Sequence, residues 1–133
     1  PFLNWTWKVN NTFPNLDELT KEGDDFAARV YLVFDSGVMI WRTKALNYVW
    51  SSNQPIGSSW PSPFSKNVMM KAVQSGDQHL KSWITEKRNV RIDLAELFGT
   101  DIQSIDGVAI MTDSDNAQGK ATAFFGDIYF TEK

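Results

Sequence analysis

The sequence predicts an all-β domain, an antiparallel β-sandwich with one short helix near residues 93–98. Three observations favour this class. Short segments in which apolar and polar residues alternate recur along the chain, as expected of half-buried strands. Clusters of Gly, Pro, Asp and Ser separate these segments, which is typical of turns between short strands. Only one segment has helical character, whereas a parallel α/β fold needs helices between its strands.

The first two predicted strands carry the clearest alternation. Within residues 3–9 the apolar side chains occupy every second position, namely Leu3, Trp5, Trp7 and Val9. Residues 25–35 repeat the pattern on one face with Phe26, Ala28, Val30, Leu32 and Phe34. Because successive side chains of a strand point to opposite faces, each set is expected to line the core.

The remaining elements follow from shorter patterns. Residues 51–65 are rich in Ser and Pro and are predicted to form a long loop that carries Trp60. The helix is predicted from Asp93 to a stop at Gly99, with Asp93 as the capping residue. Further strands are expected at 39–42, 45–50, 67–74, 83–92, 105–111 and 121–130, with a turn at 35–37.

Composition restricts the class of protein. A chain of 133 residues is the size of one domain, so a single sandwich is expected over residues 1–133. The net charge of −3 comes without a basic run, which argues against nucleic-acid binding. No apolar stretch approaches the length of a membrane span, so we expect no membrane insertion. The chain begins at Pro1 without a Met, and we expect it to lack upstream residues of the full-length protein.

Three stretches together resemble one known family. They are Lys21-Glu22-Gly23-Asp24-Asp25-Phe26-Ala27-Ala28-Arg29-Val30-Tyr31, then Lys44-Ala45-Leu46-Asn47-Tyr48-Val49-Trp50, then Ala109-Ile110-Met111-Thr112-Asp113-Ser114-Asp115-Asn116 continuing to Phe125-Gly126-Asp127-Ile128. The family is an uncharacterised one of bacterial exported proteins, domain of unknown function 3047. The resemblance implies a periplasmic or extracellular protein and names no activity.

A second, weaker resemblance concerns the fold. The closing pattern Gly126-Asp127-Ile128-Tyr129-Phe130 is similar to the last strands of galactose-binding-like jelly rolls. That likeness implies a jelly-roll sandwich, and carbohydrate-binding modules are common among such folds. Because one fold supports many functions, the likeness alone does not establish binding.

One polar face of the strand at residues 25–35 is a candidate ligand site. Asp25, Arg29 and Tyr31 share this face. Together they can hydrogen-bond to sugar hydroxyls or to a carboxylate, since Arg offers a planar fork of donors. Asp24 would point to the opposite face if both acids belonged to the strand. The alternative is a turn aspartate with an ion pair that only holds the sheet together.

The aromatic residues suggest a platform for stacking sugars. Tyr48, Trp50 and Trp60, together with Trp41, are the candidates, and Trp60 in its loop is predicted to be the most exposed. The alternative is that these rings belong to the core, as most large aromatic residues do. The tryptophans in strand patterns are expected to be core residues, namely Trp5, Trp7 and Trp83.

A polar loop near the end of the chain is a candidate calcium site. Asp113, Asp115 and Asn116 bring oxygen-bearing side chains close together, as Ca²⁺ requires. The loop does not fit the EF-hand pattern, and the alternative is a turn whose side chains bind their own backbone. No other cofactor is expected.

These features favour a non-catalytic module that binds a polysaccharide or small polar ligand. One alternative is an envelope enzyme acting on a glycan through Asp24, Asp25, Asp113 or Asp115, which requires carboxylates within reach of one reacting atom. The other alternative is an interaction domain whose polar motifs only stabilise the fold.

Overall fold

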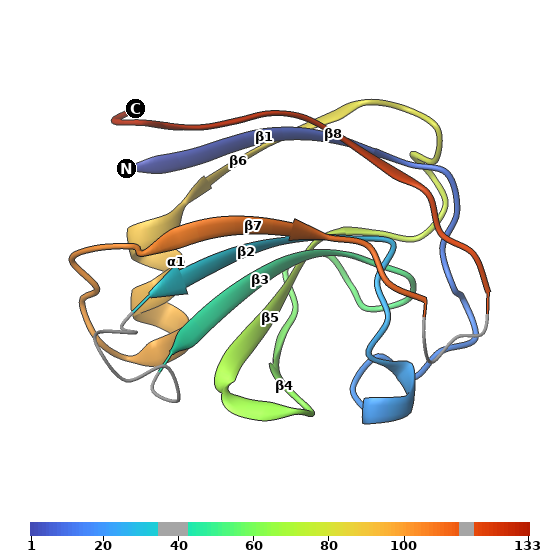
Figure 1. Cartoon of the computed structure of the whole chain (residues 1–133), viewed down its shortest axis with the longest axis horizontal. Helices are drawn as coiled ribbons and strands as arrows, with labels where there is room; N and C mark the ends of the chain where they lie inside the picture. The colour runs from blue at the N-terminus through green and yellow to red at the C-terminus, as the bar shows by residue number, and fades with distance from the viewer. Residues whose placement is uncertain (35–42, 115–118) are drawn as a thin grey trace.

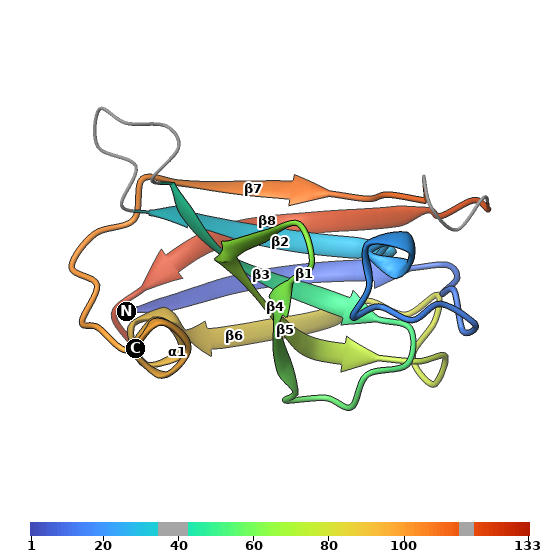
Figure 2. The same cartoon turned by 90° about the horizontal axis from the view of Figure 1, so that it is seen from below.

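Two β-sheets pack face to face, and a helix lies across one end of them (Figure 1; Figure 2). The computed structural model describes residues 1–34, 43–114 and 119–133. One sheet has three strands in the order β6-β1-β8, and the other has five in the order β4-β5-β3-β2-β7. The elements are β1 (Phe2–Val9), η1 (Lys21–Gly23), β2 (Ala28–Phe34), β3 (Lys44–Ser51), β4 (Ser59–Ser62), β5 (Ser65–Ser75), β6 (Ile84–Asn89), α1 (Val90–Phe98), β7 (Gly107–Met111) and β8 (Ala123–Thr131). The predicted β-sandwich with one short helix is confirmed, and the finer jelly-roll assignment stays a prediction.

The core forms between the sheets, as the alternation predicts. All four predicted core residues of β1 are buried in it, and so are the four of β2, namely Ala28, Val30, Leu32 and Phe34. Phe26, which precedes β2, is also buried but packs in a separate cluster, so its predicted place in this core is wrong. Rings from the two sheets meet in this core: the centroids of Trp5 and Tyr48 lie 5.2 Å apart, and those of Trp7 and Trp50 lie 5.8 Å apart. Such tilted aromatic pairs add stabilisation beyond the apolar area that they bury.

One strand pair departs from the antiparallel pattern. β3 and β5 run parallel, with Ala45 opposite Val68 and Tyr48 opposite Lys71, whereas the other described pairs are antiparallel. The reason lies in residues 51–65, where a single loop was predicted. This segment contains β4, which pairs with the far side of β5, so the chain reverses once more before β5 begins.

The helix begins three residues earlier than predicted. Asn89 is its capping residue, because its side chain accepts a hydrogen bond from the amide of Ile92 at 3.2 Å. Asp93 lies one turn inside the helix, where it is buried and binds Arg88, so its predicted capping role is wrong. The predicted stop is confirmed, since Gly99 adopts the left-handed conformation at φ 73°.

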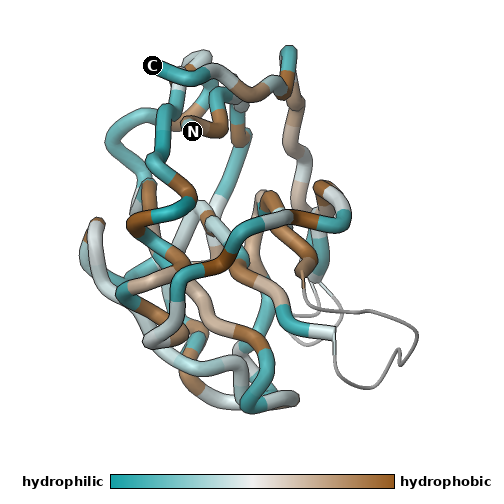
Figure 3. Tube along the Cα trace, turned by 90° about the vertical axis from the view of Figure 1, so that its left-hand side faces the viewer, coloured by the Kyte–Doolittle hydropathy of each residue, from teal (hydrophilic) through white to brown (hydrophobic). Residues whose placement is uncertain are grey.

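A second, smaller apolar cluster covers part of the outer face of the five-stranded sheet. Hydrophobic and hydrophilic residues alternate along parts of the Cα trace (Figure 3). Buried apolar residues of the five-stranded sheet fall into two separate clusters, so this sheet has apolar side chains on both faces. Val49 and Ala72 face away from the main core, and β4 lays Trp60 against them. The cluster consists of Phe26, Val49, Trp60, Met70 and Ala72.

Several predictions fall on residues outside the described ranges. They are the strand at 39–42 with Trp41, the turn at 35–37, and the proposed calcium ligands Asp115 and Asn116. In the part of the chain that the structure describes, no helix has both the length and the apolar character needed to span a membrane.

Candidate ligand-binding cleft

A cleft of about 420 Å³ opens on the outer face of the five-stranded sheet. Val30 and Leu32 point into the core, so the alternate residues Arg29 and Tyr31 of β2 point outward into the cleft. The segment before β2, the hairpin of β4 and β5, and the end of β7 supply the walls. The lining residues are Asp24, Asp25, Arg29, Tyr31, Asn47, Ser62, Phe64, Ser65, Val68, Met111 and Asp113, and we call this the acidic cleft.

Arg29 lies at the centre of the acidic cleft and is buried. Its Nε donates to Oδ1 of Asp113 at 3.3 Å, and its Nη2 donates to Oδ2 of the same carboxylate at 2.5 Å. Nη2 also donates to the backbone carbonyl of Asp24 at 2.7 Å. Its side chain stacks over the ring of Phe26, with the guanidinium carbon 4.7 Å from the centroid. A buried guanidinium requires such partners, because removing it from water without them is costly.

Asp113 reaches this position through the end of β7. Its amide donates to the carbonyl of Phe26 at 3.3 Å, and its Oδ1 accepts from the amide of Phe26 at 3.0 Å. These bonds join the loop after β7 to the segment before β2, 87 residues away in the chain. The bidentate contact with Arg29 then fixes the carboxylate against the floor of the cleft.

Asp24 and Asp25 both line the cleft, in contrast to their predicted placement on opposite faces. That prediction assumed a strand from residue 25, whereas β2 begins at Ala28, so strand alternation does not apply to them. Gly23 sets the path of the chain just before them. A Cβ at this glycine would lie 1.9 Å from the backbone oxygen of Asp17, so only glycine permits this close approach.

The loop that carries these acids is held to the sheet by a buried carboxylate. Glu18 accepts hydrogen bonds from the hydroxyl of Ser51, from the amide of Ser52 at 2.9 Å and from the amide of Asn53 at 3.3 Å. Burial raises the pKa of Glu18, although these bonds act in the opposite direction. The loop before η1 is therefore tied to the end of β3, which helps to position Asp24 above the sheet.

The carboxylates of the cleft are electrostatically unusual. Burial raises the pKa of Asp24 to about 6, and the negative charges of Asp113 and Asp25 add to this effect, while Arg29 opposes it. Burial also raises the pKa of Asp113, against the lowering effect of Arg29. The same cause raises the pKa of Tyr31. Raised carboxyl pKa values are frequent at functional sites, although structural ion pairs produce them as well.

Several buried acceptor atoms of the cleft residues have no hydrogen-bond donor among the described residues. Oδ1 of Asp24 and Oδ1 of Asn47 are two of them, and these residues are only 7% and 2% exposed. Oδ2 of Asp24 forms an ion pair with Nη2 of Arg29 at 3.6 Å, so only one of its two oxygens is engaged. Buried polar atoms normally have hydrogen-bond partners, so these two oxygens are exceptions to the usual pattern.

Phe64 supplies an aromatic ring at the rim of the acidic cleft. It lies in the turn between β4 and β5 and is 60% exposed. The ammonium of Lys21 lies over this ring, 5.7 Å from its centroid. Neither Phe64 nor Asn47 was among the predicted site residues. An aromatic residue within a Ser- and Pro-rich turn, and a polar residue inside the apolar strand β3, are the sequence signals that could have found them.

The three members of the predicted aromatic platform that the structure describes do not form a platform. Tyr48 and Trp50 are buried in the main core, where the hydroxyl of Tyr48 donates to Asp93 at 2.7 Å. Trp60 is also buried, because β4 places it against Phe26, and its predicted exposure is wrong. Trp83 shows the opposite error: it was expected in the core and is 51% exposed. Trp5 and Trp7 are core residues as predicted.

The structure describes one of the three predicted calcium ligands. Both oxygens of Asp113 accept bonds from Arg29, so a cation would have to compete with the guanidinium. Among the described residues, no group of three or more His, Cys, Asp or Glu side chains is arranged to hold a metal ion. Calcium binding through Asp115 and Asn116 stays a prediction.

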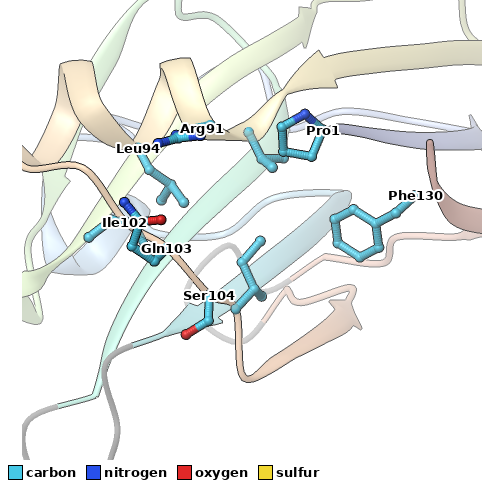
Figure 4. Close-up of a pocket in the computed structure, with 9 residues that line it drawn as sticks. Pro1, Arg91, Leu94, Ile102, Gln103, Ser104 and Phe130 are labelled. Carbon is cyan, nitrogen blue, oxygen red and sulfur yellow. The ribbon is translucent and has the colours of Figure 1, made fainter. Parts of the chain in front are cut away.

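A second pocket, of about 280 Å³, lies at the end of the sandwich next to α1 (Figure 4). Leu94, Ile102 and Phe130 make its lining largely apolar. The polar group of Arg91 at this pocket is already engaged, because it forms two hydrogen bonds with Asp101 at 2.8 Å and 2.7 Å. None of the predicted site residues lies here.

A family model described as "Protein of unknown function (DUF3047)" matches residues 1–129. The chain belongs to this family, and the resemblance carried by its three sequence stretches is confirmed. No curated protein and no solved structure matches the chain at a significant level. The family description names no activity, so a function has to be argued from the acidic cleft.

Proposed function

We propose that this member of the DUF3047 family is a non-catalytic module that binds carbohydrate through the acidic cleft, in the periplasm or outside the cell. One observation carries the proposal. Carboxylates from two distant parts of the chain, Asp24, Asp25 and Asp113, line one cleft together with Arg29 and the exposed Phe64.

This combination suits a sugar ring. Carboxylate and amide oxygens accept hydrogen bonds from hydroxyl groups, and a hydroxyl can accept in turn from a guanidinium. An exposed aromatic ring offers a flat apolar face to the C–H face of a pyranose. A cleft with a few convergent polar groups beside an apolar surface is the usual form of a small-ligand site. Phe64 thus takes the stacking role that the sequence assigned to Trp60.

The bonds of Arg29 favour binding over catalysis. Its bidentate contact holds Asp113 in one orientation, and the contact with the backbone of Asp24 holds the opposite wall. A site fixed in this way needs little rearrangement on binding, which lowers the entropic cost of association. The same contact leaves Asp113 poorly placed to act as a free nucleophile or base.

Glycan-array screening followed by calorimetry tests the proposal. We expect the chain to bind one class of neutral or basic oligosaccharide and Phe64→Ala to weaken that binding at least about fivefold, since a hot-spot contact contributes about 1 kcal/mol or more. The matched control is Trp83→Ala. Trp83 is similarly exposed but lies beside the three-stranded sheet, against Phe124, so its loss should leave the affinity unchanged.

Two outcomes would count against carbohydrate binding in this cleft. The first is the absence of binding at millimolar oligosaccharide by protein shown to be folded. The second is binding that Trp83→Ala reduces and Phe64→Ala does not, which would locate the glycan on the other sheet.

Hydrolysis of an envelope glycan is a second candidate function, favoured by the pKa of Asp24. A carboxyl group with a pKa of about 6 can donate a proton near neutral pH. Oδ2 of Asp24 and Oδ2 of Asp113 lie 3.6 Å and 2.5 Å from the same nitrogen of Arg29, so the two carboxylates are close enough for paired chemistry. Release of reducing ends from a bound glycan, abolished by Asp24→Asn, would support an enzyme; binding without release supports the module.

A further inference from the structure

In the described part of the chain the two sheets end in four edge strands, and three of these carry a feature that discourages pairing with a further strand. β4 contains Pro61, which has no backbone N–H, and β6 carries the charged run Glu86-Lys87-Arg88. β8 contains Asp127, and its pairing with β1 includes a register shift. β7 has no such feature: it contains no charged residue and no proline, and its pairing with β2 is regular.

The core-facing side chains of β7 are also exposed. Val108 and Ile110 lie opposite Leu32 and Val30 of β2, which are fully buried in the main core. Directly opposed residues project from the same face of a sheet, so Val108 and Ile110 are on the core side, yet they are 37% and 48% exposed. β7 and β8 border the same side of the sandwich (Figure 2), where the core-facing Phe130 of β8 is exposed as well. Among the described residues, the core is therefore open along this side.

The backbone of β7 offers hydrogen bonds along the same edge. Residues of a strand direct their N–H and C=O groups alternately to its two sides, and β2 is the one described strand that pairs with β7. The groups directed away from β2 form a row with which another strand can pair. The sequence of β7 is complementary to itself. In an antiparallel pair centred on Ala109, Val108 of one copy lies opposite Ile110 of the other, and no charged residues meet.

We infer that β7 pairs with β7 of a second copy of this chain, antiparallel about a two-fold axis at Ala109, so that the two five-stranded sheets form one continuous sheet. A two-fold axis normal to the sheet keeps each face of the sheet on its own side. The acidic clefts of the two copies therefore open on the same face of the dimer. The contact involves one short strand from each copy, and such small interfaces are typical of weak association, so we expect a dissociation constant on the order of 50 µM.

Sedimentation velocity of the whole chain tests this inference. Between about 5 µM and about 500 µM we expect the monomer to convert to a dimer and to no larger species. Ile110→Lys should raise the dissociation constant at least about tenfold, because it places an ammonium group against Val108 of the other copy. Ile92→Lys is the matched control: Ile92 is similarly exposed but lies on α1 and not on an edge strand, so dimerisation should be unchanged. Circular dichroism checks that both variants are folded.

A cysteine at the proposed axis tests the register. The chain contains no cysteine, so a single introduced thiol reports on one position. Ala109→Cys should form a disulfide between copies under mild oxidation, because directly opposed Cβ atoms lie about 5 Å apart. Met111→Cys is the control on the same edge. Its thiols should stay unlinked, because the two copies of this position are four residues apart along the paired strands, or about 14 Å.

Each contrary outcome overturns the inference. A monomer at every concentration leaves the edge of β7 to a strand of another protein, and growth beyond a dimer shows that β7 meets a different edge. A dimer that Ile110→Lys leaves intact lies elsewhere on the molecule. Equal crosslinking of Ala109→Cys and Met111→Cys, or no crosslinking of Ala109→Cys, rules out the two-fold axis at Ala109. None of these outcomes depends on carbohydrate binding.

Discussion

Replacing Asp24 by Asn should stabilise the protein at neutral pH, although it removes one partner of a buried ion pair. Burial raises the pKa of this carboxyl from 3.8 to about 6. Folding therefore strengthens proton binding at Asp24. The resulting stability is fully present below the unfolded pKa of 3.8 and is lost as the pH rises through 6. Asn resembles the protonated acid at every pH. The variant should therefore keep this stability as the pH rises.

The size of the effect follows from the shift. A change of roughly two pKa units corresponds to about 3 kcal/mol at 1.36 kcal/mol for each unit. About 2 kcal/mol of this stability should be lost between pH 4.5 and pH 7.5. The loss is smaller than the full value because the carboxyl of the unfolded chain is already partly ionised at pH 4.5. For a chain of this length, 2 kcal/mol shifts the melting temperature by about 7 °C.

The assay is thermal unfolding of the protein and of Asp24→Asn across that pH range, with the pKa of Asp24 read directly by carbon NMR of its carboxyl group. Asp101→Asn is the control, because the stability that Asp101 contributes should depend on pH in the opposite direction. The exposed Asp101 binds Arg91, and this contact lowers the pKa of Asp101. The stability that Asp101 contributes is therefore present above the pKa of the unfolded chain and is lost as the pH falls. Equal pH profiles for the protein and Asp24→Asn, or a variant less stable at pH 7.5, would refute the reasoning.

Two further predictions concern the partners of Asp24. Arg29→Ala should destabilise the protein by about 3–5 kcal/mol in urea denaturation, because it leaves buried carboxylates without their cation, whereas Arg91→Ala should have a far smaller effect because its ion pair is exposed. Similar losses in both variants would contradict this. We also expect millimolar Ca²⁺ and excess EDTA to leave the melting temperature unchanged, because Arg29 occupies both oxygens of Asp113. A calcium site at one hundred times its dissociation constant would add about 2.7 kcal/mol, so a clear rise in the melting temperature with Ca²⁺ would contradict this expectation.

The sequence by itself determined which residues of β1 and β2 face the core. The alternation of Leu3, Trp5, Trp7 and Val9 requires one face of β1 to be buried, whatever strand lies beside it. Gly99 ended the helix for an equally local reason, because glycine adopts the left-handed conformation at little cost. The face that holds Arg29 and Tyr31 followed from the same two-residue period.

Only the tertiary structure decided what lies against those faces. Asp113 meets Arg29 across 84 residues, β5 runs parallel to β3, and Trp60 is buried because β4 crosses over Phe26. Strand periodicity repeats over two residues and contains no information about which distant strand becomes a neighbour. The acidic cleft is made by such neighbours: the strand β2, the loop before it, the end of β7 and the hairpin that carries Phe64 come together only when the five-stranded sheet has formed.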